Sequence, residues 1–401
     1  MICLKKKYLI YIKIMESFSF NTTPGIRFGS NFDISTAEEV SKKLGKNIFF
    51  ITDPGLKELG LIDPVIKELK KYSNIEIFSE VEVDPSIKTL NLSIEIAKNN
   101  NTTGVIGFGG GSSMDIAKLC ALVLGSKEDI HDAWGVANAK GPRLPLVLYP
   151  TTAGTGSEVT PISIITQEDS EKKGVSSPII LPDLAILDPL LTVGLPSKIT
   201  AATGIDAMVH AIESFASKSK NNNLISQTLA KESLRLLGSS IREAVFNGKN
   251  IDARSNMLIG SMLAGVSFGN SPVAGVHALA YPIGGTYHIP HGLSNALVLP
   301  HVLKFNSTSI EAINNYSELA PIIFPEIEIN SSNQDITAIF IEKISSLSLD
   351  LGLEQKLREV GIPQNACETM AKDAMKQTRL LINNPKEILE QDAFEIYKSA
   401  W

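Results

Sequence analysis

Cysteine is scarce in this chain, and positive charge is not in surplus. The 401 residues include three cysteines, Cys3, Cys120 and Cys367, which lie far apart and form no CxxC pair. This usage argues against a disulfide framework and against a thiolate zinc site, and it predicts a cytoplasmic protein. Because the formal net charge is −6, no basic surplus exists to neutralise phosphates, and we expect no nucleic-acid partner.

Long apolar runs are also missing. No stretch approaches the roughly 18 apolar residues that a membrane helix needs, so we expect no membrane association. The opening residues combine Lys5–Lys7 with a short apolar run, but Lys13 interrupts this run and no small-residue cleavage site follows. We interpret residues 1–14 as an extension outside the fold.

The first half of the chain alternates short apolar runs with helical patterns. The runs occupy residues 47–52, 74–78, 104–108 and 145–149 and are rich in Ile, Phe, Val and Leu. Helical patterns separate them, for example over 56–72 and 85–99. This alternation predicts a parallel, Rossmann-like sheet with helices on both faces.

The second half has a different texture. Strand-like runs disappear, and long helical patterns occupy residues 196–215, 223–247, 251–268, 335–351 and 385–397. A junction marked by proline lies at 188–196. We therefore predict an α/β domain over 15–191, followed by an all-helical domain over 192–401.

A glycine-rich turn connects the third apolar run to a helix. The turn and the start of the helix contain Gly109, Gly110, Gly111, Ser112, Ser113 and Asp115. The two serines are candidate N-caps. A strand, a glycine-rich turn and a helix N-terminus can bind phosphate, because free N–H groups and the helix dipole meet the anion. The spacing matches neither GxGxxG nor a P-loop, and tight packing alone would also explain the glycines.

A hydroxyl-rich segment, TTAGTGSE at 151–158, follows the fourth run. Its hydroxyl groups belong to Thr151, Thr152, Thr155 and Ser157. They could donate hydrogen bonds to a polar ligand, although a solvent-exposed loop would have the same composition.

Four side chains have the types and spacing of a metal site. Asp206 and His210 are four residues apart, which places them on one face of a helix. His277 and His291 could add two more ligands, from a helix and from the loop after it. Three imidazoles and one carboxylate suit Zn²⁺ or Fe²⁺. Taken singly, each of these histidines could also be an ordinary structural residue.

Four motifs together resemble the iron-containing (group III) alcohol dehydrogenases. They are GGGSSMDIAK, TTAGTGSEVT, DAMVHAIESF and GVHALAYPIGGTYHIPHGLSNALVLPHV. The resemblance extends from about residue 16 to the C-terminus, with the motifs in the family's order. It implies a nucleotide-binding α/β domain followed by a helical metal-binding domain, and it favours a homodimer.

The resemblance also implies a reaction. A metal acting as a Lewis acid would hold the oxygen of an alcohol, aldehyde or ketone, and hydride would pass to or from the nicotinamide of NAD(P) in the cleft between the domains. Tyr281 stands where many members of the family have a second histidine. A phenol is a poor proton acceptor at neutral pH, so we expect Tyr281 to shape the substrate pocket.

The resemblance assigns the remaining residues as follows. The metal ligands would be Asp206, His210, His277 and His291, with Fe²⁺ as the expected ion and Zn²⁺ as the alternative. Gly109–Asp115 would hold the pyrophosphate, the hydroxyl-rich segment would line the cofactor cleft, and Phe268 would lie near the substrate.

Asp53 matches an acidic position that contacts the adenine ribose. A carboxylate there favours NAD over NADP because it repels a 2′-phosphate. Asp53 could instead simply end the preceding strand in a turn.

Several other functions fit part of the pattern. A zinc-dependent polyol dehydrogenase or a hydroxyacid-oxoacid transhydrogenase-like enzyme would use the same fold. A metallohydrolase would use the ligands but not the glycine-rich turn. A nucleotide-binding protein without catalysis would be expected to have lost a ligand, and none of the four is missing.

Overall fold

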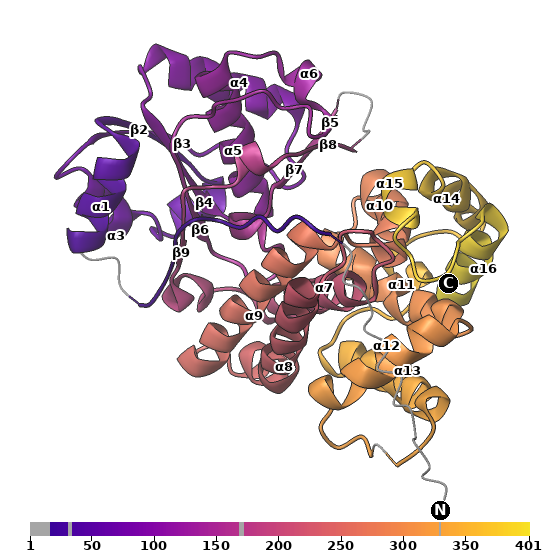
Figure 1. Cartoon of the computed structure of the whole chain (residues 1–401). Helices are drawn as coiled ribbons and strands as arrows, with labels where there is room; N and C mark the ends of the chain where they lie inside the picture. The colour runs from indigo at the N-terminus through magenta and orange to yellow at the C-terminus, as the bar shows by residue number, and fades with distance from the viewer. Residues whose placement is uncertain (1–16, 31–33, 168–171, 329) are drawn as a thin grey trace, which may run out of the picture.

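The computed structural model describes residues 17–30, 34–167, 172–328 and 330–401. The predicted extension, 1–14, lies outside the described residues. Figure 1 shows an α/β part, which contains the N-terminal half of the chain, beside a helical part that contains the rest. The fold class predicted from the sequence is thereby confirmed.

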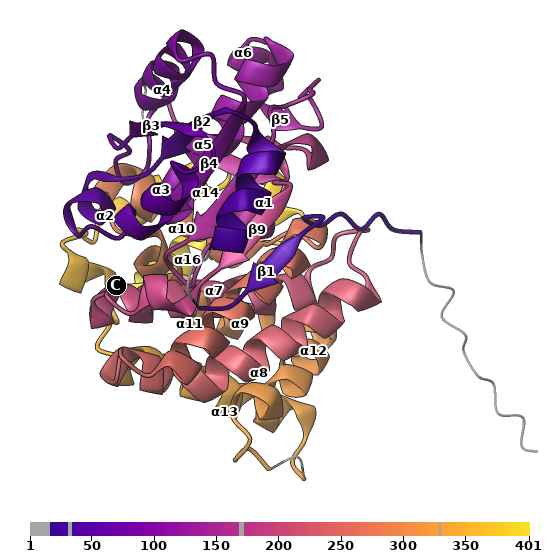
Figure 2. The ribbon, with the colours of Figure 1, turned by 90° about the vertical axis from the view of Figure 1, so that its left-hand side faces the viewer.

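A sheet of six parallel strands forms the centre of the α/β part. In order across the sheet the strands are β1 (Ile26–Phe28), β9 (Leu184–Leu187), β6 (Leu146–Pro150), β4 (Gly104–Gly109), β2 (Asn47–Ile51) and β3 (Asn74–Phe78). Figure 2 shows β1 and β9 side by side, with β1 at the edge.

Helices cover both faces of this sheet because its strands are apolar on both sides. In β2, Ile48 and Phe50 pack with α1 (Ile34–Leu44) and α3 (Asp63–Leu69). The alternate residues Phe49 and Ile51 pack with α4 (Ile87–Asn99) and α5 (Gly111–Ser126). Two short helices, α2 (Pro54–Glu58) and α6 (Ile130–Ala133), complete this part.

Five strands were not predicted from the sequence. β7 (Ile162–Thr166) and β8 (Lys172–Ser176) pair antiparallel, and β8 also pairs with β5 (Gly135–Val136) in a second small sheet. β1 and β9 have only three and four residues. Segments as short as β1 and β9 contain too few residues to show a clear alternation of apolar and polar side chains.

The helical part begins with α7, and no strand follows β9 among the described residues. Its helices are α7 (Ser197–Ala216), α8 (Leu224–Phe246), α9 (Ile251–Asn270), α10 (Gly275–Tyr287), α11 (His291–Asn306), α12 (Ile310–Ile323), α13 (Asn333–Asp350), α14 (Ala366–Ala374), α15 (Thr378–Leu381) and α16 (Glu390–Ala400). The predicted helix over 385–397 was displaced. Helix α16 starts at Glu390, because the carboxylate of Asp392 accepts a hydrogen bond from Leu389 N at 2.9 Å.

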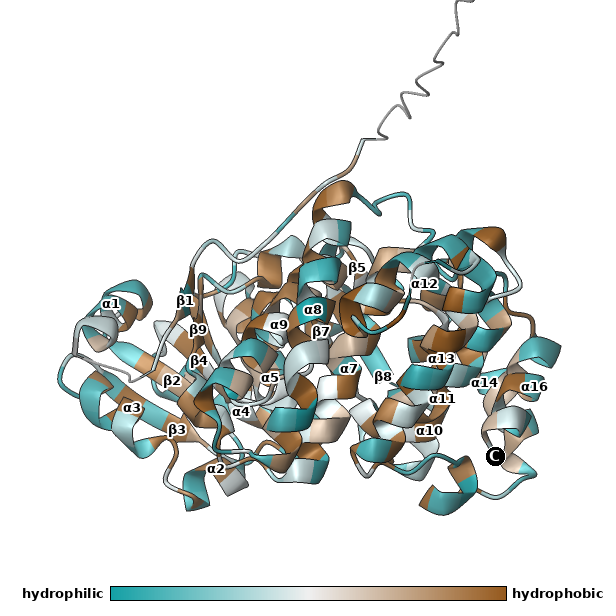
Figure 3. Ribbon diagram, turned by 90° about the horizontal axis from the view of Figure 1, so that it is seen from below, coloured by the Kyte–Doolittle hydropathy of each residue, from teal (hydrophilic) through white to brown (hydrophobic). Residues whose placement is uncertain are grey.

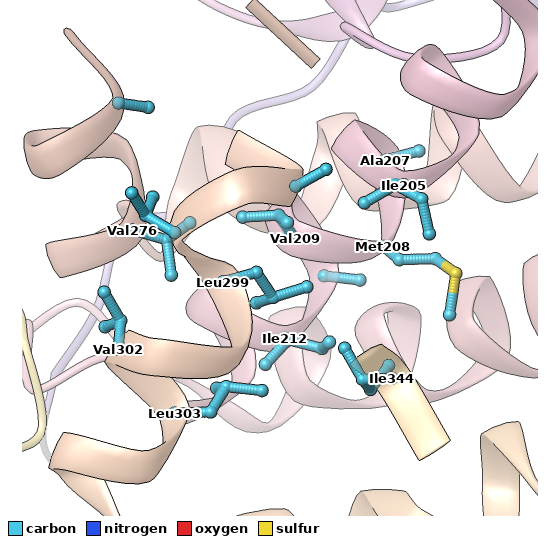
Figure 4. Packing of buried hydrophobic residues seen from close by; sticks show 14 of the residues in the cluster. Ile205, Ala207, Met208, Val209, Ile212, Val276, Leu299, Val302, Leu303 and Ile344 are labelled. Carbon is cyan, nitrogen blue, oxygen red and sulfur yellow. The ribbon is translucent and has the colours of Figure 1, made fainter. Parts of the chain in front are cut away.

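Helix α7 lies at the centre of the helical core. Its residues Ile205, Val209 and Ile212 lie beside Leu299 and other apolar side chains of α11 (Figure 4). The peripheral helices are amphipathic: on α3 and α13, teal and brown residues share one ribbon in Figure 3. In the described part of the chain, no single helix is long and apolar enough to span a membrane. The pair α9 and α10 passes that test only when joined across a bend of 106°.

Two glycines bring the two parts into direct backbone contact. A β-carbon on Gly156, just before the short helix η1 (Ser157–Val159), would lie 2.5 Å from the Cα of Gly265 in α9. Gly156 also has a φ of +58°, which favours glycine. A side chain at either position would force the two backbones apart.

Candidate metal and cofactor site

The loops after β2, β4 and β6 meet at one edge of the sheet. The chain order reverses between β2 and β4, because β3 lies on one side of β2 and the later strands lie on the other. In parallel sheets, ligands bind at the carboxyl ends of strands beside such a reversal. Asp53, Gly109 and Thr151 stand at these three ends, and Thr151 N donates to Gly109 O at 3.0 Å.

The glycine-rich turn leads directly into α5. The helix starts at Gly111, with Gly110 as its N-cap and no side-chain cap, so the prediction of Ser112 or Ser113 as N-cap was wrong. Ser113 is buried inside the first turn, where its Oγ would lie only 2.7 Å from a β-carbon on Gly109. The uncapped N–H groups of this turn remain suited to an anion.

Asp115 and Ser157 hold the hydroxyl-rich segment against α5. Ser157 Oγ donates to Asp115 Oδ1 at 2.7 Å, and Ile164 N donates to Asp115 Oδ2 at 2.8 Å. Buried Lys118, which the sequence analysis did not single out, donates to Ser157 Oγ at 2.7 Å. Burial lowers the pKa of Lys118 to about 8, against the opposing effect of Asp115. These two predicted cofactor residues therefore already have protein partners.

Asp53 has a local structural role. Its Oδ1 accepts a hydrogen bond from Leu56 N at 3.0 Å and caps α2. The structural role that the sequence offered as an alternative for Asp53 thus explains the contact of Oδ1. The other oxygen, Oδ2, lies 3.4 Å from where a β-carbon on Gly109 would stand, beside the glycine-rich turn.

The four predicted metal ligands converge in the helical part. One potential ligand atom from each of Asp206, His210, His277 and His291 lies within 4.8 Å of all the others. Asp206 and His210 come from α7, His277 from α10, and His291 from the first residue of α11. We call these four residues the ligand cluster.

The surroundings of His210 and His291 favour their neutral forms. Burial, followed by the neighbouring His277, holds the pKa of His210 well below its ordinary value. Burial is also the main reason why the pKa of His291 falls to about 3, although 34% of its side chain is exposed. Phe268 stacks on His210 with 4.3 Å between the ring centroids and orients that ring. Neutral imidazoles present the lone pairs that a metal requires.

Two residues that the sequence analysis missed surround the ligand cluster. Glu213 Oε2 accepts from His277 Nδ1 at 2.6 Å. Asn295 Nδ2 donates to Asp206 Oδ1 at 2.6 Å and lies 3.3 Å from the Nε2 atoms of both His277 and His291. Glu213 could have been found from its spacing, because it follows His210 by three residues and so lies on the same face of the helix.

Tyr281 borders the ligand cluster, with its ring centroid 6.2 Å from that of His291. Its hydroxyl oxygen accepts a hydrogen bond from Arg379 Nη2 at 3.2 Å. His288 and His301, the other nearby histidines, do not belong to the cluster. His288 ends α10 with a φ of +55°, and the ring of His301 pairs with Ser399.

One cavity of about 490 Å³ joins the two sets of residues. The helical part contributes the ligand cluster, Phe268, Tyr281 and Arg379. The α/β part contributes Gly110, Gly111, Ser112, Asp115, Thr152, Thr155 and Ser157. A ligand at the start of α5 can therefore reach the ligand cluster without leaving the cavity.

Fold and site together define a metal-binding dehydrogenase with a nucleotide-binding half. Models of the iron-containing alcohol dehydrogenase family match residues 24–189, and models of its C-terminal domain match residues 200–401. The chain belongs to the iron-containing alcohol dehydrogenase family. It is an oxidoreductase that acts on alcohols, as the sequence predicted.

Individual relatives support the same conclusion. The chain is 40% identical to long-chain-alcohol dehydrogenase 1 of Geobacillus thermodenitrificans, over 90% of this chain and 91% of the relative. A crystal structure of 1,3-propanediol oxidoreductase matches with a TM-score of 0.91 and 32% identity, covering 96% and 100% of the two chains. The sulfoacetaldehyde reductase of Bifidobacterium kashiwanohense, solved in complex with NAD⁺, matches with a TM-score of 0.83 and 27% identity over 96% and 98%.

Proposed function

We propose that this chain is an Fe²⁺-dependent, NAD-linked alcohol dehydrogenase whose metal is held by Asp206, His210, His277 and His291. The observation that carries the proposal is the convergence of these ligand atoms within 4.8 Å, on a cavity that also reaches the glycine-rich turn. Without a cation, the neutral imidazoles of His210 and His291 and the carboxylate of Asp206 would direct lone pairs at one another. The donor set therefore fits a divalent metal, and it accepts Zn²⁺ as well as Fe²⁺.

The protein side chains have separate roles in this proposal. A divalent ion supplies Lewis acidity that lowers the pKa of an alcohol. Phe268 keeps the ring of His210 in place, and Tyr281 shapes the wall that faces the reacting carbon. The uncapped N–H groups at Gly111 and Ser112 hold the pyrophosphate, so that nicotinamide reaches the cluster along the cavity.

NAD is the preferred dinucleotide in this proposal. Asp53 Oδ2 lies at the strand ends beside Gly109, where a carboxylate would accept from a ribose 2′-hydroxyl and repel a 2′-phosphate. The sulfoacetaldehyde reductase of Bifidobacterium kashiwanohense has NAD⁺ bound in its crystal structure, which supports the same choice.

Small alcohols and aldehydes are the proposed substrates. The named relatives act on long-chain alcohols, propanediol and sulfoacetaldehyde, which share a carbinol or aldehyde carbon. A metallohydrolase would use the ligand cluster but would leave the strand-end half of the same cavity without a role. The observed continuity of the cavity therefore favours the dehydrogenase.

A homodimer is the proposed assembly. Strand β1 is an edge strand whose three residues are all exposed, with Ile26 and Phe28 at 41% and 48%. An uncovered edge with apolar side chains is a surface that a second copy can pair with. The cytoplasmic location stays a prediction from the cysteine content.

Reconstitution with metal tests the function. The protein freed of metal would be loaded with Fe²⁺ or Zn²⁺ and assayed through NADH absorbance, with a panel of alcohols and aldehydes in both directions. We expect turnover that requires metal and prefers NAD over NADP. A loaded, folded protein that bound NADH but turned over none of the panel would contradict the proposal.

A further inference from the structure

Glu213 lies at the junction of α7 and α10 and is almost fully buried. Its Oε1 accepts from Val276 N at 2.6 Å, and its Oε2 accepts from Ala274 N at 3.1 Å. Oε2 also accepts from His277 Nδ1 at 2.6 Å. One carboxylate therefore binds both the backbone at the start of α10 and the imidazole of a ligand-cluster residue.

The backbone bonds stabilise the start of α10. Ala274, its N-cap residue, offers no side-chain hydrogen bond to the open N–H groups. The carboxylate of Glu213 accepts from three of these groups, on Ala274, Val276 and His277. Its negative charge also interacts favourably with the positive end of the helix dipole. Because Asp206, His210 and Glu213 share one face of α7, this contact fixes α10 relative to two members of the ligand cluster.

The bond to the imidazole determines which ring nitrogen can bind a metal. A carboxylate only accepts hydrogen bonds, so the Nδ1 atom of His277 must carry the proton. In the neutral ring with this tautomer, Nε2 carries the free lone pair, and Nε2 lies 3.3 Å from the donor group Asn295 Nδ2 inside the cluster. A carboxylate bonded to the outer nitrogen of a ligating histidine fixes the tautomer and the ring direction.

We propose that Glu213 is a positioning residue for the metal centre, which sets the tautomer and direction of His277 and thereby the affinity of the site for its metal. This inference rests on the metal site of the proposed function. It adds a residue outside the ligand cluster whose replacement weakens metal binding.

The substitution Glu213→Gln tests the role with little change in shape. An amide has one oxygen and one NH₂ group, whereas the start of α10 presents donors to both carboxylate oxygens. If the NH₂ group faces His277 Nδ1, the ring must accept there and carry its proton on Nε2, which blocks the ligand atom. If it faces Val276 N, two donors oppose each other and the helix start is displaced.

The effect of Glu213→Gln would be measured as a change in metal affinity and as a change in the visible spectrum of bound Co²⁺. The dissociation constant for Zn²⁺ would be obtained by competition with a chelator, and the visible spectrum would be recorded after Co²⁺ substitution. We expect Glu213→Gln to weaken affinity about 10–100-fold and to change the Co²⁺ bands. Neither readout needs turnover.

Asn384→Ala is the matched control. Asn384 is buried, and its Oδ1 accepts from Gly275 N at 3.3 Å, so it also contacts the start of α10 but not the imidazole of His277. We expect this control to lower the free energy of unfolding without changing the metal affinity or the Co²⁺ bands. An equal loss of affinity in Asn384→Ala would reduce Glu213 to a packing role and overturn the proposal.

The remaining outcomes are also decisive. Unchanged affinity and bands in a folded Glu213→Gln would overturn the role of Glu213 alone. If that variant does not fold, Glu213→Asp keeps the charge but shortens the reach to His277, and wild-type affinity in it would overturn the role equally. A wild-type protein that binds no metal at all would instead contradict the proposed function.

Discussion

The hydroxyl oxygen of Tyr281 accepts a hydrogen bond from Arg379 Nη2 at 3.2 Å, while its ring lies 6.2 Å from the ring of His291. The guanidinium thus occupies one acceptor position of the phenol and leaves its O–H free to donate into the cavity. This geometry suits a residue that shapes the pocket. We therefore expect Tyr281→Phe to change KM or substrate preference more than kcat.

The pH–rate profile of Tyr281→Phe, beside wild type and with one alcohol that both oxidise, checks this expectation. The profile of kcat/KM should stay nearly intact. Loss of a basic limb in the variant, with a drop in kcat of about 100-fold or more, would show that the phenol carries the proton.

His210→Ala should remove most bound metal and most activity. His210 and Asp206 lie one turn apart on α7, so the variant keeps only three ligands. The fold should survive, because the core around α7 and α11 is large and apolar. Metal analysis and circular dichroism of the purified variant would decide, and wild-type metal content would refute the ligand assignment.

Gly110→Val should weaken cofactor binding without unfolding the protein. Gly110 has a φ of −76°, which any residue adopts, and its β-carbon would lie 3.6 Å from Thr152, an ordinary contact. The strain that a glycine-rich turn suggests is therefore located at Gly109, where φ is +152°. Titration with NADH measures the effect, and normal affinity in Gly110→Val would remove this residue from the pyrophosphate site.

Asp53→Asn separates the two roles of Asp53. The amide oxygen can still accept from Leu56 N and cap α2, so the free energy of unfolding should change little. The charge that repels a 2′-phosphate is lost, and we expect the preference for NAD over NADP to fall by about 1–3 kcal/mol. The ratio of kcat/KM for the two dinucleotides is the measurement, and an unchanged ratio would leave Asp53 with its capping role alone.

Glu158→Gln should stabilise the protein more at neutral pH than at pH about 5. Burial raises the pKa of Glu158 from 4.5 to about 7, and its Oε1 has no hydrogen-bond partner. Between these values the folded state holds a proton that the unfolded state has released, so the stability that Glu158 contributes is present below its unfolded pKa and is lost as the pH rises through about 7. Urea unfolding of both proteins across this range should show the gap widening with pH, and a constant gap would contradict the shift.

Different physical signals explain which elements could be predicted. Strands β2 and β3 are continuous apolar or alternating runs bounded by turn residues, and the predicted ranges agree with the observed ones within one residue. Asp206 and His210 were recognisable because a spacing of four has one geometric meaning on a helix. His277 and His291 were candidates from residue type alone, and the resemblance to a family then connected them with the pair on α7, which no local pattern does.

Other features depend on contacts between distant residues. Glu213 looks like any helical glutamate until α10 packs against α7, and the contact between Tyr281 and Arg379 joins residues 98 positions apart. Ser113 is not the N-cap because Gly110 holds that position, so that Ser113 lies inside the first turn of α5, where it packs beside Gly109. The N-cap preferences of serine and glycine could not decide which of these positions starts the helix.

The backbone contact between Gly156 and Gly265 has a consequence for engineering. The strand-end loops lie at or before residue 158, and the ligand cluster begins at Asp206. The proposed dinucleotide and metal residues thus lie in separate stretches of the chain. We expect a chimera joined within 188–196 to exchange one set and keep the other. Both parent chains would need glycine at the two touching positions, because a single methyl group there would push the α/β part away from the helical part.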